Sequence, residues 1–178
     1  MIETSFGQPF GGIIQVAYVV EDLHQSMAEF AAKFNVGPWY YTDAYTFTEG
    51  TYRGQPTDIQ MALALGFSGH MCFELIQSID DRPSVYHDIV RQRGFGFHHL
   101  GMATRDFERD VEKYRKLGYE LAFSGKSVRG IRFAYFDTTK DLPGMLELIE
   151  FTDAQEKFLS TIHQASVNWD GTDPIRKL

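Results

Sequence analysis

The sequence contains an internal repeat, which constrains the fold strongly because both copies are expected to adopt the same local structure. Residues 15–23 (QVAYVVEDL) correspond to residues 99–107 (HLGMATRDF), 84 positions further along the chain. The two segments share few identities but have the same physical pattern. Each begins as a short apolar strand and ends at an aspartate, Asp22 or Asp106, which can cap a following helix by accepting a backbone N–H bond.

A second pair of segments extends the repeat. Residues 72–76 (CFELI) correspond to residues 145–149 (MLELI), at a separation of 73 positions. The smaller separation predicts a longer middle in the first copy, around residues 40–57. Between these anchors, glycine and proline turn signals delimit three strands in each copy. We expect these strands at residues 39–48, 58–65 and 70–77 in the first copy, and at 120–123, 131–137 and 145–151 in the second.

The repeat predicts an α+β fold built from two tandem βαβββ modules. We expect the first module in residues 1–80, a linker helix in 81–96, the second module in 97–152, and a C-terminal helix with an irregular tail in 153–178. Apolar residues at near-helical spacing predict the faces with which the two module helices pack on the sheet. These residues are Leu23, Met27, Phe30 and Phe34 in the first helix and Phe107, Val111, Tyr114 and Leu117 in the second.

Composition and charge exclude several classes of function. The chain has 17 basic and 24 acidic residues and no block of Lys or Arg, so we expect no nucleic-acid partner. A single cysteine, Cys72, excludes an intrachain disulfide and a CxxC metal or redox motif. The longest apolar stretch, near residues 61–67, is too short for a membrane span, and the chain does not begin like a secretory signal. We therefore expect a cytoplasmic protein that does not associate with membranes.

Strand alternation predicts which residues of the repeat face inward. In the first strand, one face carries Ile14, Val16, Tyr18 and Val20, which suits packing against helices. The opposite face carries Gln15, and its counterpart in the second copy is His99. Each is followed two positions later by a small residue, Ala17 or Gly101, which leaves room beside it. By the same alternation, His98 points toward the helices and is expected to be structural.

Each closing strand carries one carboxylate between apolar neighbours, Glu74 in the first copy and Glu147 in the second. An ionised carboxylate in an apolar strand is costly unless it is paired or bound to a cation. The pseudo-symmetry of two βαβββ units would bring both carboxylates together with Gln15 and His99. Taken singly, each of the four is best explained as an ordinary strand residue, and the shared register is what singles them out. Together they predict a site for a divalent metal such as Zn, Ni, Co or Mn.

Other polar residues are weaker candidates. His70 shares the parity of Glu74 and could lie at the rim, although a histidine at a loop edge is the simpler interpretation. The remaining histidines, His24, His87 and His163, fall on expected helices and are expected to be exposed. Three basic residues near one hairpin could meet a substrate carboxylate or phosphate, although a solvated charged turn is favoured: Lys126, Arg129 and Arg132.

The pattern resembles the vicinal oxygen chelate superfamily, which includes glyoxalase I, methylmalonyl-CoA epimerase, extradiol dioxygenases and metal-free bleomycin-resistance proteins. The resemblance covers about residues 13–151. It is carried by residues 15–23 (QVAYVVEDL), 94–101 (GFGFHHLG) and 144–150 (GMLELIE). It implies a cupped eight-stranded mixed sheet with a metal in the cup, a small-molecule substrate and a homodimer.

The resemblance also implies roles for the four inward residues. The superfamily takes its metal ligands from the first and last strands of each module, which here means Gln15, Glu74, His99 and Glu147. This set is similar to that of eukaryotic-type glyoxalase I, whereas methylmalonyl-CoA epimerases typically place His first and Gln at the position of Glu74. The shared chemistry implies Glu147 as catalytic base and ligand in turn, with Glu74 also in the catalytic pair but mainly a ligand. No clear glutathione-binding signature is present.

Three functions follow as hypotheses. The first is a metal-dependent isomerase, epimerase or lyase that moves a proton next to a carbonyl group. The second is a metal-free protein that binds an aromatic small molecule, consistent with the 15 Phe, 9 Tyr and 2 Trp residues and with Gln at the first ligand position. The third, a redox oxygenase, is disfavoured because one histidine cannot complete a two-histidine, one-carboxylate iron site. The aromatic residues between Trp39 and Tyr52 are the expected wall of the substrate pocket.

Overall fold

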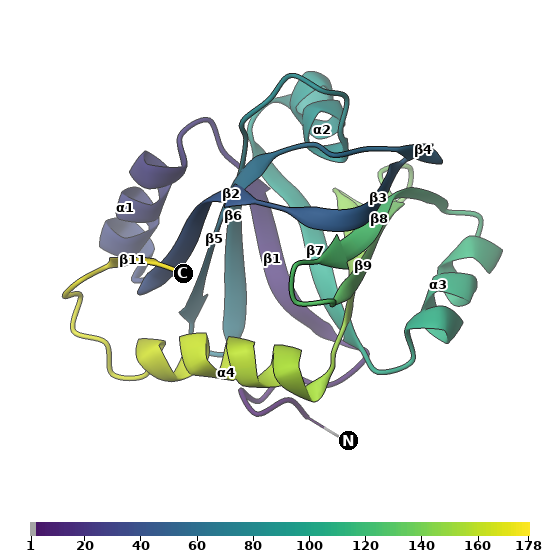
Figure 1. Cartoon of the computed structure of the whole chain (residues 1–178). Helices are drawn as coiled ribbons and strands as arrows, with labels where there is room; N and C mark the ends of the chain where they lie inside the picture. The colour runs from purple at the N-terminus through teal and green to yellow at the C-terminus, as the bar shows by residue number, and fades with distance from the viewer. Residues whose placement is uncertain (1–2) are drawn as a thin grey trace.

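Each copy of the repeat forms a βαβββ module in the computed structural model, which describes residues 3–178 (Figure 1). The predicted first module begins at residue 1, and its first two residues lie outside this range. The first module comprises β1 (Ile13–Val19), α1 (Leu23–Phe34), β2 (Trp39–Tyr45), β5 (Met61–Ser68) and β6 (Met71–Ser78). The second comprises β7 (Gly96–Thr104), α3 (Phe107–Lys116), β8 (Glu120–Ser127), β9 (Arg132–Asp137) and β10 (Met145–Glu150).

The two modules share one continuous mixed sheet. The strand order is β11-β2-β5-β6-β1-β7-β10-β9-β8-β3-β4, so the first strands of the two modules, β1 and β7, lie antiparallel at its centre. Each first strand also pairs in parallel with the last strand of its own module, β1 with β6 and β7 with β10. The predicted α+β class with paired βαβββ modules is therefore confirmed. Eight strands form the modules, and three short strands extend the sheet beyond them.

The longer middle of the first copy accounts for two of the extra strands. The single strand expected at residues 39–48 is wrong, because β2 ends at Tyr45 and β3 (Phe47–Tyr52) begins a new pairing. While β2 pairs with β5 of its own module, β3 pairs with β8 of the second module and with the two-residue β4 (Gln55–Pro56). The β2–β3 segment thus crosses from one side of the sheet to the other and closes the cup at the front (Figure 1).

The caps of both module helices follow the sequence pattern. Asp22 accepts a hydrogen bond from the backbone N–H of Gln25 at 2.8 Å, and Asp106 accepts one from Arg109 at 3.4 Å. The packing faces are shorter than expected, because Leu23 and Met27 are buried whereas Phe34 is 62% exposed. Leu117 is likewise exposed, since it caps the C-terminal end of α3 beyond the edge of the sheet.

Two irregularities in the central strand pair change the expected side-chain parity. Between β1 and β7, Ile13 pairs with Met102 but Gln15 pairs with Gly101, which leaves Ile14 as an extra residue on β1. Ile14 consequently packs with Phe6 and Leu63 rather than with the α1 side of the sheet, so its predicted helix-facing position is wrong. A second shift leaves His98 as an extra residue on β7, next to His99. A bulge of this kind re-aims side chains at its position.

Two further helices lie over the cup. The linker helix α2 (Val85–Arg93) packs near β7, and the C-terminal helix α4 (Asp153–Ser166) runs along the opposite end of the cup and packs against β5 (Figure 1). The expected irregular tail is correct up to its end, where β11 (Ile175–Lys177) pairs in parallel with β2. Within residues 3–178, no helix has both the length and the apolar character that crossing a membrane would require.

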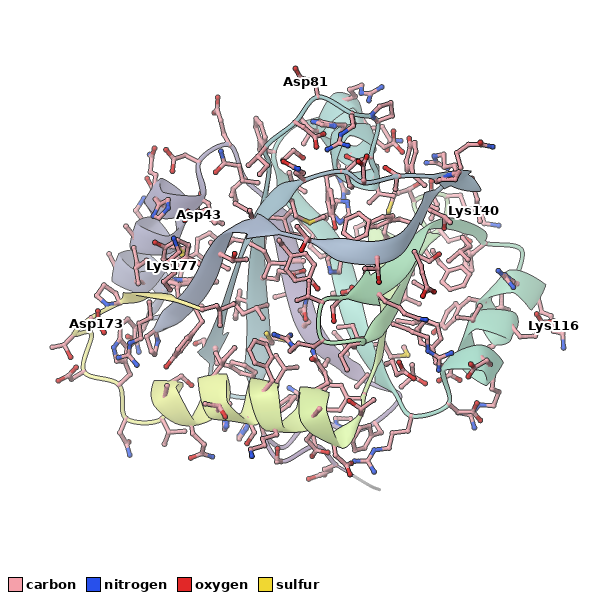
Figure 2. All side chains as sticks on the ribbon, in the orientation of Figure 1. Asp43, Asp81, Lys116, Lys140, Asp173 and Lys177 are labelled. Atoms are coloured by element: carbon pink, nitrogen blue, oxygen red, sulfur yellow. The ribbon has the colours of Figure 1, made fainter. Side chains whose placement is uncertain are left out.

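Charged side chains mark the outside of this architecture. Figure 2 shows Lys116 projecting from α3, Lys140 from the loop between β9 and β10, and Asp173 and Lys177 from the C-terminal segment. The interior is apolar, with Trp39, Phe67, Phe123 and Phe136 among the largest buried side chains. A small set of buried polar side chains interrupts this interior at the base of the cup.

Candidate metal centre

The four inward-facing residues of the repeat lie together at the base of the cup, within one chain. Gln15 on β1 pairs with Gly101 on β7 and with Cys72 on β6, while His99 on β7 pairs with Ala17 and Met145. Glu74 and Glu147 occupy the adjacent strands β6 and β10. The side chains of all four are nearly excluded from solvent, with Gln15 4%, Glu74 6%, His99 0% and Glu147 7% exposed.

The expected space beside these residues depends on Gly101. A Cβ atom at this position would lie 2.9 Å from the Cβ of Gln15 and 3.2 Å from the Cδ1 of Ile149. Both distances are shorter than carbon atoms normally tolerate, so a larger residue would displace Gln15. The corresponding residue of the first module, Ala17, keeps its methyl group in the core.

The polar atoms of the four side chains converge. His99 Nε2 lies 3.1 Å from Glu147 Oε2 and 3.3 Å from Glu74 Oε2, and the amide nitrogen of Gln15 donates to Glu74 Oε2 at 2.7 Å. One donor atom from each of Glu74, His99 and Glu147 lies within 4.8 Å of the others. Rotating the Gln15 amide would exchange its nitrogen and oxygen, so its oxygen can face the same point.

This geometry fits a metal ion better than a hydrogen-bonded cluster. His99 Nε2 and Glu147 Oε2 are buried and have no hydrogen-bond partner, because the neighbouring oxygens lie near them but not along hydrogen-bond directions. Ligand atoms held about 2.1 Å from one ion, at angles between 90° and 110°, are about 3.0–3.4 Å apart. The observed separations of 3.1 and 3.3 Å fall in this range. Two carboxylates, one imidazole and one amide are also a donor set that suits divalent ions of this class.

His98 orients His99, a role that strand parity did not predict. His98 Nε2 lies 3.2 Å from the carbonyl oxygen of Val85 on α2, and His98 Nδ1 lies 2.9 Å from His99 Nδ1. A carbonyl only accepts, so His98 Nε2 carries the proton and His98 Nδ1 accepts from His99 Nδ1–H. The neutral His99 ring is then left with its lone pair on Nε2, facing the two carboxylates. Such support of a ligand histidine through its other nitrogen is typical of metal sites.

The electrostatics of the centre favour a positive charge at His99 Nε2. Burial lowers the pKa of His98 well below its usual value, and the proximity of His99 adds to the effect, so His98 is neutral. Burial also disfavours a charged His99, but close contact with Glu147 and Glu74 and attraction from their carboxylates outweigh it and raise its pKa to about 9. Burial raises the pKa of Glu74. A cation or a proton at His99 Nε2 therefore relieves the same accumulation of negative charge.

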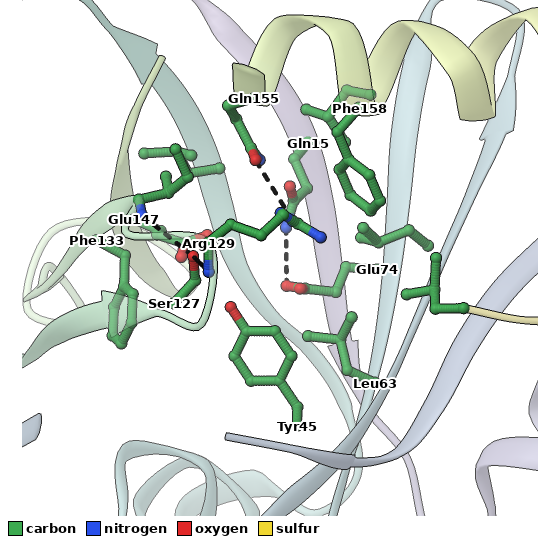
Figure 3. Close-up of a pocket in the computed structure, with 15 residues that line it drawn as sticks. Gln15, Tyr45, Leu63, Glu74, Ser127, Arg129, Phe133, Glu147, Gln155 and Phe158 are labelled. Atoms are coloured by element: carbon green, nitrogen blue, oxygen red, sulfur yellow. Dashed lines mark hydrogen bonds between the residues drawn. The ribbon is translucent and has the colours of Figure 1, made fainter. Parts of the chain in front are cut away.

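A pocket of about 560 Å³, including open space at its mouth, leads from the surface to this centre (Figure 3). Gln15, Glu74 and Glu147 form the base, and aliphatic or aromatic residues of β5, β9, β10 and the turn before β9 form much of the wall. These wall residues are Leu63, Leu65, Ile131, Phe133 and Ile149.

The expected aromatic wall from Trp39 to Tyr52 is largely wrong. Of these residues only Tyr45 lines the pocket, where its hydroxyl points between Glu74 and Ser127 (Figure 3). Trp39 packs with α1, Phe47 packs on Phe123, and the Tyr52 hydroxyl donates to Asp88, because the β2–β3 segment alternates its faces as it crosses the cup. Burial and the nearby carboxylates of Glu74 and Glu147 raise the pKa of Tyr45 to about 12, so Tyr45 remains a hydrogen-bond donor.

The C-terminal helix supplies lining residues that the sequence analysis missed. Gln155, Phe158 and Leu159 of α4 face the pocket. The spacing of Phe158, Leu159 and Ile162 in the sequence indicates an apolar helix face. That spacing could have shown that α4 packs on the sheet, but not that it covers the cup, because the position of a terminal helix depends on the turn that precedes it.

The other histidines lie outside this centre. His70 Nδ1 lies 2.8 Å from the carbonyl oxygen of Phe6, and its ring stacks on that of His163. His163 was expected to be exposed, but it is only 7% exposed, because it packs between Phe6 and Phe67. His24 is exposed and His87 is half-buried, where His87 Nδ1 lies 2.8 Å from the carbonyl oxygen of Arg82.

The three basic residues of the β8–β9 hairpin separate into two kinds. Lys126 pairs with Glu49, and Arg132 pairs with Glu150 and Glu108, as a solvated charged turn predicts. Arg129 differs, because its side chain lines the pocket and its guanidinium carbon lies 3.6 Å from the ring centroid of Phe158. Arg129 is exposed at the turn, as predicted, but its side chain also reaches the mouth of the pocket.

This combination of fold and site defines a class of protein with paired βαβββ modules around a buried carboxylate–histidine centre. Residues 14–135 match the family model of the Glyoxalase/Bleomycin resistance protein/Dioxygenase superfamily. The chain belongs to this superfamily, and the predicted resemblance is confirmed. Comparison with curated protein sequences gives no significant match.

Solved structures of low sequence identity share the fold. A hypothetical protein from Bacillus halodurans superposes with a TM-score of 0.58 at 13% identity, covering 80% of this chain and 95% of that one. Methylmalonyl-CoA epimerase from Mycobacterium tuberculosis gives 0.57 at 18% identity, covering 90% and 97%. A Streptomyces coelicolor methylmalonyl-CoA epimerase variant in complex with 2-nitronate-propionyl-CoA gives 0.56 at 14% identity, covering 82% and 97%.

Proposed function

We propose that this protein is a metal-dependent isomerase, epimerase or lyase that transfers a proton next to a carbonyl group of a small, partly apolar molecule. The observation that carries the proposal is the pair of buried atoms without hydrogen-bond partners, His99 Nε2 and Glu147 Oε2, at the base of an open pocket. Buried polar atoms normally have partners, so this arrangement is best explained by a ligand that both atoms bind.

Four side chains would hold a divalent ion, Zn, Ni, Co or Mn, at this point: Gln15, Glu74, His99 and Glu147. When bound, such an ion supplies Lewis-acid chemistry, which stabilises negative charge developing on a substrate oxygen by several kcal/mol. The strands hold the ligands rigidly, because each ligand lies on a central strand of the sheet that is paired on both sides. His98 fixes the protonation of His99, so the imidazole does not need to rearrange.

Glu147 is the residue best placed to move a proton. Its Oε2 atom has no hydrogen-bond partner, whereas Glu74 Oε2 accepts a bond from Gln15 and is thereby held in place. Both carboxylates lie at the boundary between the metal-binding point and the pocket. We assign Glu147 as the general base and Glu74 mainly as a ligand. Acid–base catalysis by a positioned carboxylate typically contributes about 10²- to 10⁴-fold to a rate.

Tyr45 is the donor best placed to assist. Its hydroxyl points into the pocket and stays protonated because its pKa is about 12. It can therefore donate a hydrogen bond to a substrate oxygen that becomes negative when a neighbouring C–H bond loses its proton. The apolar wall around it excludes water, which strengthens that interaction.

The structural relatives are consistent with the proposed reaction class but do not establish it. Two of the similar structures are methylmalonyl-CoA epimerases, which is consistent with an isomerase or epimerase. At 14% and 18% identity the likeness shows the fold alone. The reaction class therefore rests on the chemistry of the four buried side chains.

Metal content tests the proposal directly. We expect protein purified without added metal to contain close to one equivalent of a divalent ion, or to take up one of Zn, Ni, Co or Mn on titration, by elemental analysis. Glu147→Ala should lower this content, whereas Glu112→Ala, on the exposed face of α3, should not. A wild-type protein that neither contains nor binds any of these ions would overturn the proposal.

Proton transfer is tested by hydrogen exchange with solvent. The metal-loaded protein in D₂O should catalyse deuterium incorporation next to the carbonyl of at least one compound in a panel of hydroxyacetone, 2-hydroxyacetophenone and phenylpyruvate, followed by NMR. Chelation of the metal should abolish the exchange. Exchange that continues unchanged after chelation would contradict a metal-dependent mechanism.

One observation favours a second function, a metal-free protein that binds small molecules. The hydrogen bond from Gln15 to Glu74 satisfies two of the four side chains without a metal. This alternative predicts that the pocket binds aromatic compounds equally well before and after chelation. Isothermal titration with 2-hydroxyacetophenone under both conditions distinguishes the two functions.

A further inference from the structure

Arg129 places a positive charge at the mouth of the pocket, opposite the polar base. It lies in the turn between β8 and β9, and its side chain reaches across to α4 (Figure 3). There the guanidinium rests on the ring of Phe158, with 3.6 Å between its carbon and the ring centroid, and Nη2 donates to Gln155 Oε1 at 3.4 Å. The stacked ring fixes the plane of the guanidinium, which leaves its edge available for an in-plane partner.

Arg129 is not neutralised by the protein. Among residues 3–178 no carboxylate forms an ion pair with Arg129, whereas Arg53, Arg82 and Arg132 each pair with two or more carboxylates. Its one side-chain hydrogen bond, to Gln155, is long and involves a neutral group. Although the residue is exposed at the turn, burial of its guanidinium lowers its pKa. A partly desolvated cation of this kind is stabilised by an anion from outside the protein.

The charges that line the pocket also favour an anion bound at Arg129. The charged side chains that line it are Glu74, Glu147 and Arg129. If a divalent ion occupies the centre, as the proposed function requires, it neutralises the two carboxylates. Arg129 then remains as the charged side chain of the lining that has no carboxylate partner.

We propose that Arg129, supported by Gln155 and Phe158, is a subsite for a carboxylate group of the substrate, distinct from the oxygens that meet the metal centre. This inference rests on the proposed function and narrows its substrate to a small carboxylic acid. A single planar guanidinium matches a singly charged, planar carboxylate in a bidentate arrangement. A phosphate would carry up to twice the charge, and the pocket lining offers no second cation for it.

A pair of matched probes tests the subsite. Hydroxamates chelate metals through two vicinal oxygens, so terephthalic monohydroxamate and its amide analogue, 4-carbamoylbenzohydroxamate, differ only in the charge of the remote group. Succinic monohydroxamate and its amide analogue provide a shorter pair. We expect the wild-type metal-loaded protein to bind the acid of at least one pair about tenfold or more tightly than the amide, by isothermal titration.

Substitution shows whether Arg129 causes this preference. Arg129→Met, which keeps a long unbranched side chain but removes the charge, should reduce the acid-to-amide ratio to about one while the affinity for the amide stays the same. Lys126→Met removes the same charge from the same hairpin and should leave the ratio unchanged, since Lys126 pairs with Glu49. Arg129→Lys should keep part of the preference.

Each other outcome has a definite meaning. A wild-type protein that holds metal and binds the hydroxamates without preferring the acids would overturn the subsite alone. An equal loss of acid and amide binding in Arg129→Met, with unchanged metal content, would show that Arg129 only shapes the mouth, and would also overturn the subsite. A wild-type protein that takes up no metal would overturn the proposed function and this inference together.

Discussion

The two modules contribute equally to the base of the cup but differently to its walls. Each gives one residue from its first strand and one carboxylate from its last strand, at equivalent positions of the repeat. The walls differ, because the first module extends across the cup through β2 and β3, whereas the second presents the β8–β9 hairpin with Arg129. The proposed chemistry therefore depends on residues that the modules share, and the proposed carboxylate subsite on a residue that they do not share.

Even the equivalent positions have diverged in one respect. His99 has a positioning partner in His98, whereas the matching neighbour of Gln15 is the apolar Ile14, which packs in the core. Gln15 is held instead by Glu74. In the proposed mechanism, the second module thus supplies the oriented ligand His99 and the base Glu147, whereas the first module supplies the hydrogen-bonded pair Gln15 and Glu74. Four experiments test this difference between the modules.

The largest difference is expected between the two carboxylates. Glu147→Gln should lower the rate of deuterium exchange at least about 100-fold, because an amide cannot accept the proton. Glu74→Gln should lower it about tenfold, because it replaces a charged ligand with a neutral one but keeps the base. Exchange rates measured by NMR on protein of known metal content give both values. Equal losses, or a larger loss for Glu74→Gln, would remove the assigned asymmetry.

The next effect concerns the positioning histidine. His98→Phe keeps a ring but removes the acceptor for His99 Nδ1–H, and should weaken metal binding about 10- to 100-fold. His98→Asn, which retains an acceptor, should recover part of the affinity. Ile14→Val, at the matching place in the first module, should leave metal affinity unchanged. Competition titration with a chromogenic chelator measures all three, and a His98→Phe protein with wild-type affinity would refute the orienting role.

A smaller effect separates Gly101 from Ala17. Gly101→Ala would place a methyl group 2.9 Å from the Cβ of Gln15, so we expect an overpacking cost of about 1–2 kcal/mol in the free energy of unfolding and weaker metal binding. Ala17→Gly should cost up to about 1 kcal/mol through added backbone freedom, without moving Gln15. Urea denaturation and metal titration test the pair. An unchanged metal affinity in Gly101→Ala would show that Gln15 is not held at this spacing.

The smallest effect compares the helix caps. Asp22 accepts its hydrogen bond at 2.8 Å and Asp106 at 3.4 Å, so Asp22→Ala should cost about 1 kcal/mol of stability and Asp106→Ala about 0.5 kcal/mol. Both variants should retain full metal content, because neither helix contributes a ligand. Urea denaturation gives the two costs. A larger loss for Asp106→Ala would show that cap distance does not govern them.

The repeat made much of this fold predictable. The two capped helices, the strands that carry the polar residues and the pairing of modules all follow from periodicity and from turn signals, which are local properties of the sequence. The meeting of Gln15, Glu74, His99 and Glu147 followed from pseudo-symmetry. Their roles as metal ligands, and that of Glu147 as a base, remain predictions.

Other features could not be predicted, because they depend on contacts between distant segments. The register shift that brings His98 beside His99 exists only in the pairing of β1 with β7. The path of β3 depends on β8, and the burial of His163 depends on Phe6 and Phe67. Alternation along one isolated strand contains none of this information.

The α+β class, the two modules and the inward face that carries the polar residues follow from the amino-acid sequence, because short-range periodicity fixes which side of a strand or helix is apolar. The tautomer of His99, the wall of the pocket and the separation of Arg129 from Lys126 and Arg132 become visible in the three-dimensional structure. These depend on which side chains meet across the cup, and that is set by strand register and by the placement of α4 rather than by the local pattern of residues.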